Sequence, residues 1–149
     1  VLGIPLDQSL GRSYLEKDRA DGSIMIVLAT DAPLSDRNLT RLARRTLFGL
    51  ARTGSSFSNG SGDYAIAFSV AETVRRSPEQ RSRLNRIANL PNDAVSPLFQ
   101  AAIEVTEEAI LNSLFMATTI AGYNGFVGEA VPLARVKALL GVLGGETDA

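Results

Sequence analysis

The chain has 149 residues, which is long enough for one domain with a sizeable core. Its composition, 45% hydrophobic and 21% charged, is close to the average for soluble globular proteins. Fifteen basic and sixteen acidic residues leave a net charge of -1, which gives no field to attract nucleic acid or anionic lipid. Cysteine and histidine are both absent, which excludes a disulfide, a thiolate nucleophile, a Cys/His zinc site and a Ser-His-Asp triad made from this chain alone.

The first 22 residues predict a turn-rich, exposed tail or linker. They contain Gly3, Pro5 and Gly11, and then a charged run over residues 16–19 that leads to Gly22. The chain has no apolar run of the ~20 residues that a membrane span needs, and its first residues do not resemble a signal peptide. We therefore expect a soluble, cytoplasmic protein, with the periplasm as the alternative compartment.

The next part of the chain predicts two strands separated by a helix. The continuous apolar run 24–30 is typical of a strand buried on both faces. Ser35 is a candidate N-cap for an amphipathic helix that Gly54 ends. The polar loop 54–63, GSSFSNGSGD, then leads to a second apolar strand over residues 64–70. Because connections in α/β units are usually short, we expect this loop to contact something.

Helices dominate the rest of the predicted map. The basic segment 75–86 predicts a short helix on a solvated face, and residues 93–120 a long helix with a kink near Pro97. A loop over 122–128 and a last helix over 132–143 complete the chain. The order strand, helix, strand, helix, helix predicts an α/β layered domain.

Three features are candidates for chemistry. The Gly/Ser loop lacks the phosphate-binding pattern GxxxxGK[ST] and follows a helix, so phosphate binding is disfavoured. Glu107 and Glu108 are neighbours in a helix and point about 100° apart, so at least one of them is expected to be solvent-facing or structural. The third candidate is Ser23, which in the simplest interpretation is a small residue between a loop and a strand.

Ser23 has a functional interpretation if it becomes an amino terminus. An N-terminal serine can pass its hydroxyl proton to its own α-amino group, whose pKa of roughly 7.7 to 8.0 suits a base near neutrality. No histidine is then needed. Gly22 fits this interpretation, because a residue without Cβ permits the close approach that attack on its own carbonyl requires. Spacing alone does not distinguish this from an ordinary Gly-Ser pair.

The residues from Ser23 onward resemble the small subunit of the DmpA-type aminopeptidases, which include the β-aminopeptidases and the L-aminopeptidase/D-esterases. The motifs that carry the resemblance are GSI, ATDAPL, LARTGS and SGD, and it continues through AAIEVTEEAILNSLFMATTIAGYNG. The tail VLGIPLDQSLGR resembles the end of the family's large subunit. The implied division is residues 1–22 for the end of the large subunit and 23–149 for the small, nucleophile-bearing subunit.

The resemblance implies a self-cleaving hydrolase with an αββα layered sandwich, of which this chain supplies part. The precursor is cut between Gly22 and Ser23, and Ser23 then attacks short peptides, amides or esters that carry a free amino group. By position in the SGD motif, Ser61 and Asp63 support the nucleophile, although some relatives have the longer glutamate in place of the aspartate. The oxyanion-hole asparagine and a tyrosine belong to the large subunit, which is therefore the expected partner in an oligomer of large-small pairs. No metal or other cofactor is expected.

Two other functions stay open from the sequence. An acyltransferase of the ornithine-acetyltransferase kind shares the layered architecture but usually presents a threonine nucleophile, where this chain has Ser23. A non-catalytic subunit or binding module of the same fold is the alternative from a different class. The sequence does not decide between L-, D- and β-amino acid substrates.

Overall fold

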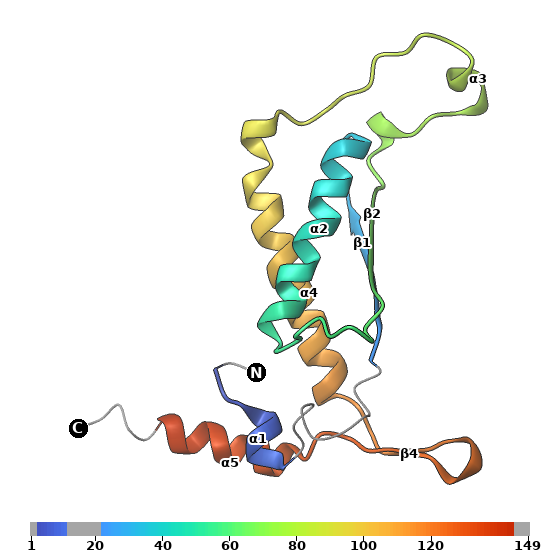
Figure 1. Cartoon of the computed structure of the whole chain (residues 1–149). Coiled ribbons are helices and arrows are strands. Elements are labelled where there is room, and N and C mark those ends of the chain that lie inside the picture. Colours follow the sequence, from blue (N-terminus) through green and yellow to red (C-terminus); the bar gives the residue numbers. More distant parts are fainter. Residues whose placement is uncertain (1–2, 12–21, 145–149) are drawn as a thin grey trace.

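A computed structural model describes residues 3–11 and 22–144 (Figure 1). Residues 12–21 of the predicted linker, which include the charged run 16–19, lie outside the described residues. The α-helices are α1 (Leu6–Leu10), α2 (Asp36–Arg52), α3 (Pro78–Arg81), α4 (Ser96–Phe115) and α5 (Leu133–Gly144), and the strands are β1 (Ile24–Thr30), β2 (Asp63–Ser69), β3 (Ile120–Ala121) and β4 (Val127–Gly128). Short 3-10 turns lie at Glu72–Val74, Asn92–Ala94 and Tyr123–Gly125.

The strands β1 and β2 pair in parallel, with α2 as the crossover between them. Their register runs from Ile24 opposite Asp63 to Thr30 opposite Ser69. A parallel pair needs such a crossover, because the chain must return to the edge at which the first strand began. The predicted order of strand, helix, strand, helix, helix is confirmed for β1, α2, β2, α4 and α5.

Only one face of this sheet is covered in the described part of the chain. Helices α2 and α4 lie on the same side of the strands (Figure 1), and Ile24, Ile26 and Leu28 on that side are half-buried. The alternate residues Met25 and Val27 are 69% and 63% exposed. The expectation of a strand buried on both faces is therefore wrong for these residues, because no described element packs on the second face. We call it the open face.

Helix α2 has the predicted caps. The Ser35 hydroxyl accepts a hydrogen bond from the backbone N–H of Asn38, and Gly54 adopts a φ of +103° just after the helix. Glycine takes this left-handed conformation without steric cost, so the helix ends there as expected. Two arginines of this helix, Arg41 and Arg45, lie over the Phe99 ring of α4, with 4.9 and 4.4 Å between Cζ and the ring centroid.

Helix α4 is shorter than its predicted span. It begins at Ser96, so Pro97 lies in the first turn, where its missing N–H removes no helical hydrogen bond and the expected kink is absent. The helix ends at Phe115 instead of continuing to Ile120. Thr118, Thr119 and Ile120 are β-branched, which disfavours helix, and the chain turns into the β3–β4 hairpin.

Two segments that were predicted to be exposed each contain a short helix. The short helix in the basic segment is confirmed as α3, with Ser77 and Gln80 forming a capping box, and its residues are exposed. The predicted tail contains the short helix α1, whose Ser9 carbonyl accepts a hydrogen bond of 2.7 Å from Arg135 of α5. A few residues of the predicted linker thus pack against the far end of the chain.

Helices α2 and α4 cross at Gly49. A Cβ on Gly49 would lie 2.5 Å from the carbonyl oxygen of Ile103 and 2.8 Å from Thr106 Cβ. Both neighbours belong to α4, and the first is backbone, so neither can give way easily. This close crossing brings α4 over the same sheet face as α2.

We expect Gly49→Ala to lower the free energy of unfolding by about 1–3 kcal/mol, because the added methyl group forces the two helices apart. Thermal unfolding of the full-length protein would detect this as a lower Tm. Gly141→Ala in α5 is the matched control, since nothing lies within 4 Å of its Cβ position among the described residues. Equal Tm values for the two variants would contradict the tight crossing.

Candidate active site

The three predicted site residues, Ser23, Ser61 and Asp63, lie at the end of the sheet where β1 and β2 begin. Gly22 and Ser23 immediately precede β1, and Ser61 and Gly62 immediately precede β2. Since parallel strands begin at the same edge, the register of Ile24 with Asp63 places Ser23 beside Gly62. Residues separated by 39 positions in the sequence therefore meet.

The Gly/Ser loop delivers Ser61 to this edge. After α2 the loop turns with Gly54 and Phe57 at positive φ, and a hydrogen bond of 2.9 Å from Ser61 N–H to the Ser58 carbonyl closes its last turn. The sequence predicted that this loop contacts something. It contacts the residues on both sides of the Gly22–Ser23 bond.

Ser61 links the proposed cleavage bond to a carboxylate. Its Oγ lies 2.6 Å from the carbonyl oxygen of Gly22 and 2.7 Å from Oδ1 of Asp63. A hydroxyl has one hydrogen, so Ser61 donates it to only one of these two oxygens at a time. A hydroxyl within 2.6 Å of a carbonyl is placed to stabilise negative charge that develops on that oxygen.

Ser23 has a partner that the sequence did not predict. The backbone N–H of Gly62 donates a hydrogen bond of 3.0 Å to Ser23 Oγ. The motif SGD includes this glycine, yet no role could be predicted for it, because every residue except proline has a backbone N–H donor. Only the parallel register reveals that Gly62 lies opposite Ser23.

The other charged candidates are structural or exposed. Glu107 forms a 3.2 Å ion pair with Arg52, which joins the end of α2 to α4, and Glu108 is exposed. The expectation that at least one of this acidic pair is structural or solvent-facing is confirmed. Among the residues that the structure describes, no three acidic side chains gather closely enough to hold a metal ion. Within the same ranges, no helix is long and apolar enough to cross a membrane.

The family model of peptidase family S58 matches residues 1–127. The chain belongs to peptidase family S58. The match includes Gly22, Ser23 and the SGD motif, so the candidate site lies inside the part of the chain that defines the membership.

Relatives of known function support the same membership. The chain is 38% identical, over 94% of its length, to the β-peptidyl aminopeptidase BapA of Sphingosinicella microcystinivorans, and it spans 38% of that protein. BapA of Sphingosinicella xenopeptidilytica is 36% identical over 80% of the chain. The chain therefore spans well under half the length of the curated relatives it matches.

Solved structures show the same fold. The L-aminopeptidase D-Ala-esterase/amidase of Ochrobactrum anthropi, described as a variant of the Ntn hydrolase fold, superposes with a TM-score of 0.81 at 30% identity. That match covers 97% of this chain and 39% of the other. A β-aminopeptidase of Burkholderia sp. gives a TM-score of 0.67 at 33% identity, over 87% of this chain and 37% of the other. The expected α/β fold of the DmpA type is confirmed, with this chain as part of it.

Proposed function

We propose that this chain carries the nucleophile of a self-processing aminopeptidase or amidase with an N-terminal serine. Its substrates are short peptides, amides or esters that have a free amino group. The observation that carries the proposal is the position of the Ser61 hydroxyl, 2.6 Å from the Gly22 carbonyl and 2.7 Å from Asp63, directly beside Ser23. Membership of peptidase family S58 and the similarity to named aminopeptidases support the same reaction class.

The first step is cleavage between residues 1–22 and 23–149. The Ser23 hydroxyl oxygen attacks the Gly22 carbonyl carbon, and Ser61 donates its hydrogen to the carbonyl oxygen as that oxygen gains negative charge. The carbon–nitrogen bond breaks, an ester between Gly22 and Ser23 Oγ forms, and the hydroxyl proton ends on the Ser23 nitrogen. Water then hydrolyses the ester. The products are a Gly22 carboxylate and a Ser23 with free hydroxyl and free amine.

The second step is hydrolysis of a substrate by the freed Ser23. Its α-amino group takes the hydroxyl proton as Oγ attacks the substrate carbonyl, and the proton passes to the leaving amine when the carbon–nitrogen bond breaks. An acyl-enzyme ester remains, which water hydrolyses. Gly62 N–H positions Oγ for attack and stabilises the negative charge that Oγ gains when it leaves from the acyl-enzyme. In this proposal Asp63, whose Oδ1 lies 2.7 Å from Ser61 Oγ, holds the charged amine.

The partner in this proposal is a large subunit from the same precursor. The open face of the sheet presents Met25, Val27, Tyr64, Ile66 and Phe68, an apolar surface that a soluble protein rarely leaves bare.

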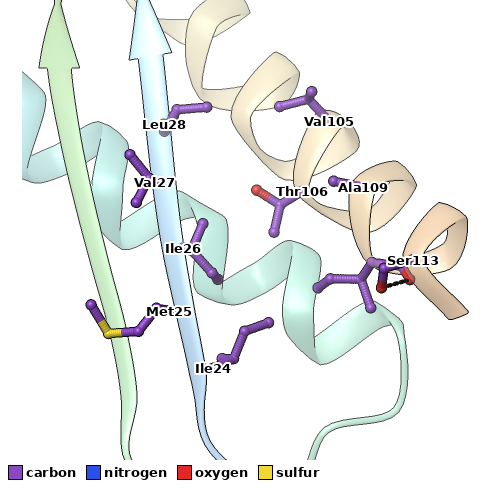
Figure 2. Close-up of a pocket in the computed structure, with 10 residues that line it drawn as sticks. Ile24, Met25, Ile26, Val27, Leu28, Val105, Thr106, Ala109 and Ser113 are labelled. Carbon is purple, nitrogen blue, oxygen red and sulfur yellow. Dashed lines mark hydrogen bonds between the residues drawn. The ribbon is translucent and has the colours of Figure 1, made fainter. Parts of the chain in front are cut away.

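A groove of about 340 Å³ runs between β1 and α4, and Figure 2 shows Ile24, Ile26 and Leu28 along one side with Val105 and Ala109 across it. Among the described residues β1 pairs only with β2, so its outer edge is available to a further strand.

We expect Val27→Glu to prevent the two processed pieces from staying together. Burial of an unpaired carboxylate against the covering subunit costs several kcal/mol. Gel filtration of the full-length gene product, followed by a gel that resolves both pieces, measures this directly. Thr73→Glu, at an exposed site outside the sheet, is the control and should leave the pieces together. Co-elution of both pieces in the Val27→Glu variant would contradict the covered face.

The reaction class is tested with the processed full-length protein and three assays. Hydrolysis of aminoacyl p-nitroanilides and of β-alanyl dipeptides is expected to release the amine product. Transfer of an acyl group to ornithine is expected to be absent. Transfer without hydrolysis would indicate an acyltransferase instead, and a folded protein inactive in all three assays would indicate a non-catalytic relative.

A further inference from the structure

The helix layer formed by α2 and α4 carries opposite charges on its two halves. Helix α2 contains five arginines and one aspartate, whereas α4 contains three glutamates and neither lysine nor arginine. The two helices pack side by side on one side of the sheet (Figure 1). In a chain with a net charge of only -1, basic and acidic residues are thus sorted between two neighbouring helices.

The outer face of α2 is basic. Residues three, four or seven positions apart share one face of a helix. Leu42 and Thr46 are buried, so the opposite face of α2 points away from the sheet. That face carries Arg37, Arg44 and Phe48, all exposed, which we call the basic stripe. Phe48 is 56% exposed, and a large aromatic ring at the surface is typical of a contact between proteins.

The outer face of α4 is acidic. Its buried residues Ala102 and Thr106 face the sheet and α2. Glu104, Glu108 and Leu111 lie on the opposite face, and both glutamates are exposed. We call these three residues the acidic stripe. Because α2 and α4 pack against each other, the two stripes lie next to each other on the outside of the helix layer.

The charges of the two stripes are not paired inside the molecule. Between the helices, Arg52 and Glu107 form an ion pair of 3.2 Å. Arg41 and Arg45 lie over the Phe99 ring instead. Within residues 3–11 and 22–144, no ion pair involves an arginine of the basic stripe or a glutamate of the acidic stripe. These exposed charges are therefore available to pair with another molecule.

We propose that this helix layer is the contact surface between two copies of the protein. The copies are related by a two-fold axis that lies in the contact plane, parallel to the helices and midway between α2 and α4. This rotation places the basic stripe of each copy over the acidic stripe of the other, so the surface is complementary to itself. The rotation also keeps positions along the helices. Since Gly49 lies beside Ile103 and Thr106 within one copy, Glu104 of the second copy meets the basic stripe near Phe48.

The size and place of the layer suit a second copy. Helices of 17 and 20 residues, about 25–30 Å long and roughly 10 Å apart, present a face of roughly 500 Å². Two copies would bury about 1,000 Å² in total, the lower limit of a specific interface. The proposed large subunit covers the open face on the other side of the sheet. Helices form the outer layers of an αββα sandwich, so α2 and α4 stay at its surface.

The test uses two charge-reversed variants of the full-length protein. In Glu104→Arg/Glu108→Arg the exposed charges of both stripes are basic, and in Arg37→Glu/Arg44→Glu they are both acidic. We expect each variant alone to raise the dissociation constant between copies by at least about 100-fold, because like charges face each other across the axis. An equal mixture of the two variants should associate as tightly as the wild type, since every facing pair of stripes is then of opposite sign.

Sedimentation velocity over a range of protein concentrations measures all of these dissociation constants. Glu72→Arg/Glu79→Arg is the matched control. It makes the same change of charge as the first variant at two exposed sites outside the helix layer, and should associate like the wild type.

Three results would overturn this inference. The first is wild-type protein that stays a single copy at the highest soluble concentration, and the second is either double variant associating as tightly as the wild type. The third is a mixture that associates no more tightly than its components. If circular dichroism shows that a double variant is misfolded, Glu108→Arg and Arg44→Glu replace the pair and are judged in the same way. None of these results depends on cleavage or hydrolysis, so failure of the proposed function would be seen separately.

Discussion

Replacement of Ser23 by alanine is expected to leave the precursor uncut and to abolish hydrolysis. Without the hydroxyl no ester can form with the Gly22 carbonyl, so the Ser23 nitrogen stays a peptide amide and no base is released. The loss in turnover should approach the order of 10⁶-fold that removal of a nucleophile produces in other hydrolases. Gel electrophoresis and p-nitroanilide hydrolysis measure both effects in one preparation.

Two further variants sharpen this experiment. Ser56→Ala removes an exposed serine of the Gly/Ser loop and should be cut and active, which excludes a general effect on folding. Ser23→Cys keeps a nucleophile and should still be cut. An uncut Ser23→Ala protein that hydrolyses substrate would rule out the N-terminal nucleophile.

Replacement of Asp63 by asparagine is expected to reduce turnover by about 10²- to 10⁴-fold while the fold persists. The amide has the shape of the carboxylate but no negative charge, so it holds the Ser61 hydroxyl and a nearby amine less firmly. The rate of cleavage at Gly22 should fall too, since Ser61 contacts that carbonyl. Time courses of processing and hydrolysis, with circular dichroism as the test of folding, provide the data.

Asp31→Asn is the matched control for this substitution. Asp31 follows β1 at the opposite edge of the sheet from Ser23, so the same change of charge there should leave processing and turnover intact. If Asp63→Asn were as active as the wild type, the SGD segment would have only a structural role.

The sequence predicted the local structure well where the signal was local. The apolar run of β1, the Ser35 cap and the stop at Gly54 each depend on a few neighbouring residues, and all are present in the structure. The predicted end of α4 was wrong. The apolar pattern continues beyond Phe115, but the β-branched residues that follow favour an extended chain.

The site could be predicted only in part for a related reason. Ser23, Ser61 and Asp63 stand out by residue type and by family motif, but their contacts depend on the register between two strands. A shift of one residue would turn Asp63 to the opposite face. The contact of Gly62 with Ser23 depends on that register, and therefore no local pattern predicts it.

The element that covers the second face of the sheet could not be predicted from the sequence. Continuous apolar sequence indicates that both faces of β1 need cover, but not which chain supplies it. Met25 and Val27 remain exposed because the described helices pack on one side only. The chain spans 38% of a curated relative, and in the proposed function the large subunit covers this side.

The most direct test of the central claim is intact-mass measurement with N-terminal sequencing of the protein expressed from the full-length gene. Two pieces are expected, the smaller of which begins Ser-Ile-Met-Ile-Val at Ser23. A folded protein that remains whole through the Gly22–Ser23 bond would contradict it, because the nucleophile would then have no amine to serve as its base.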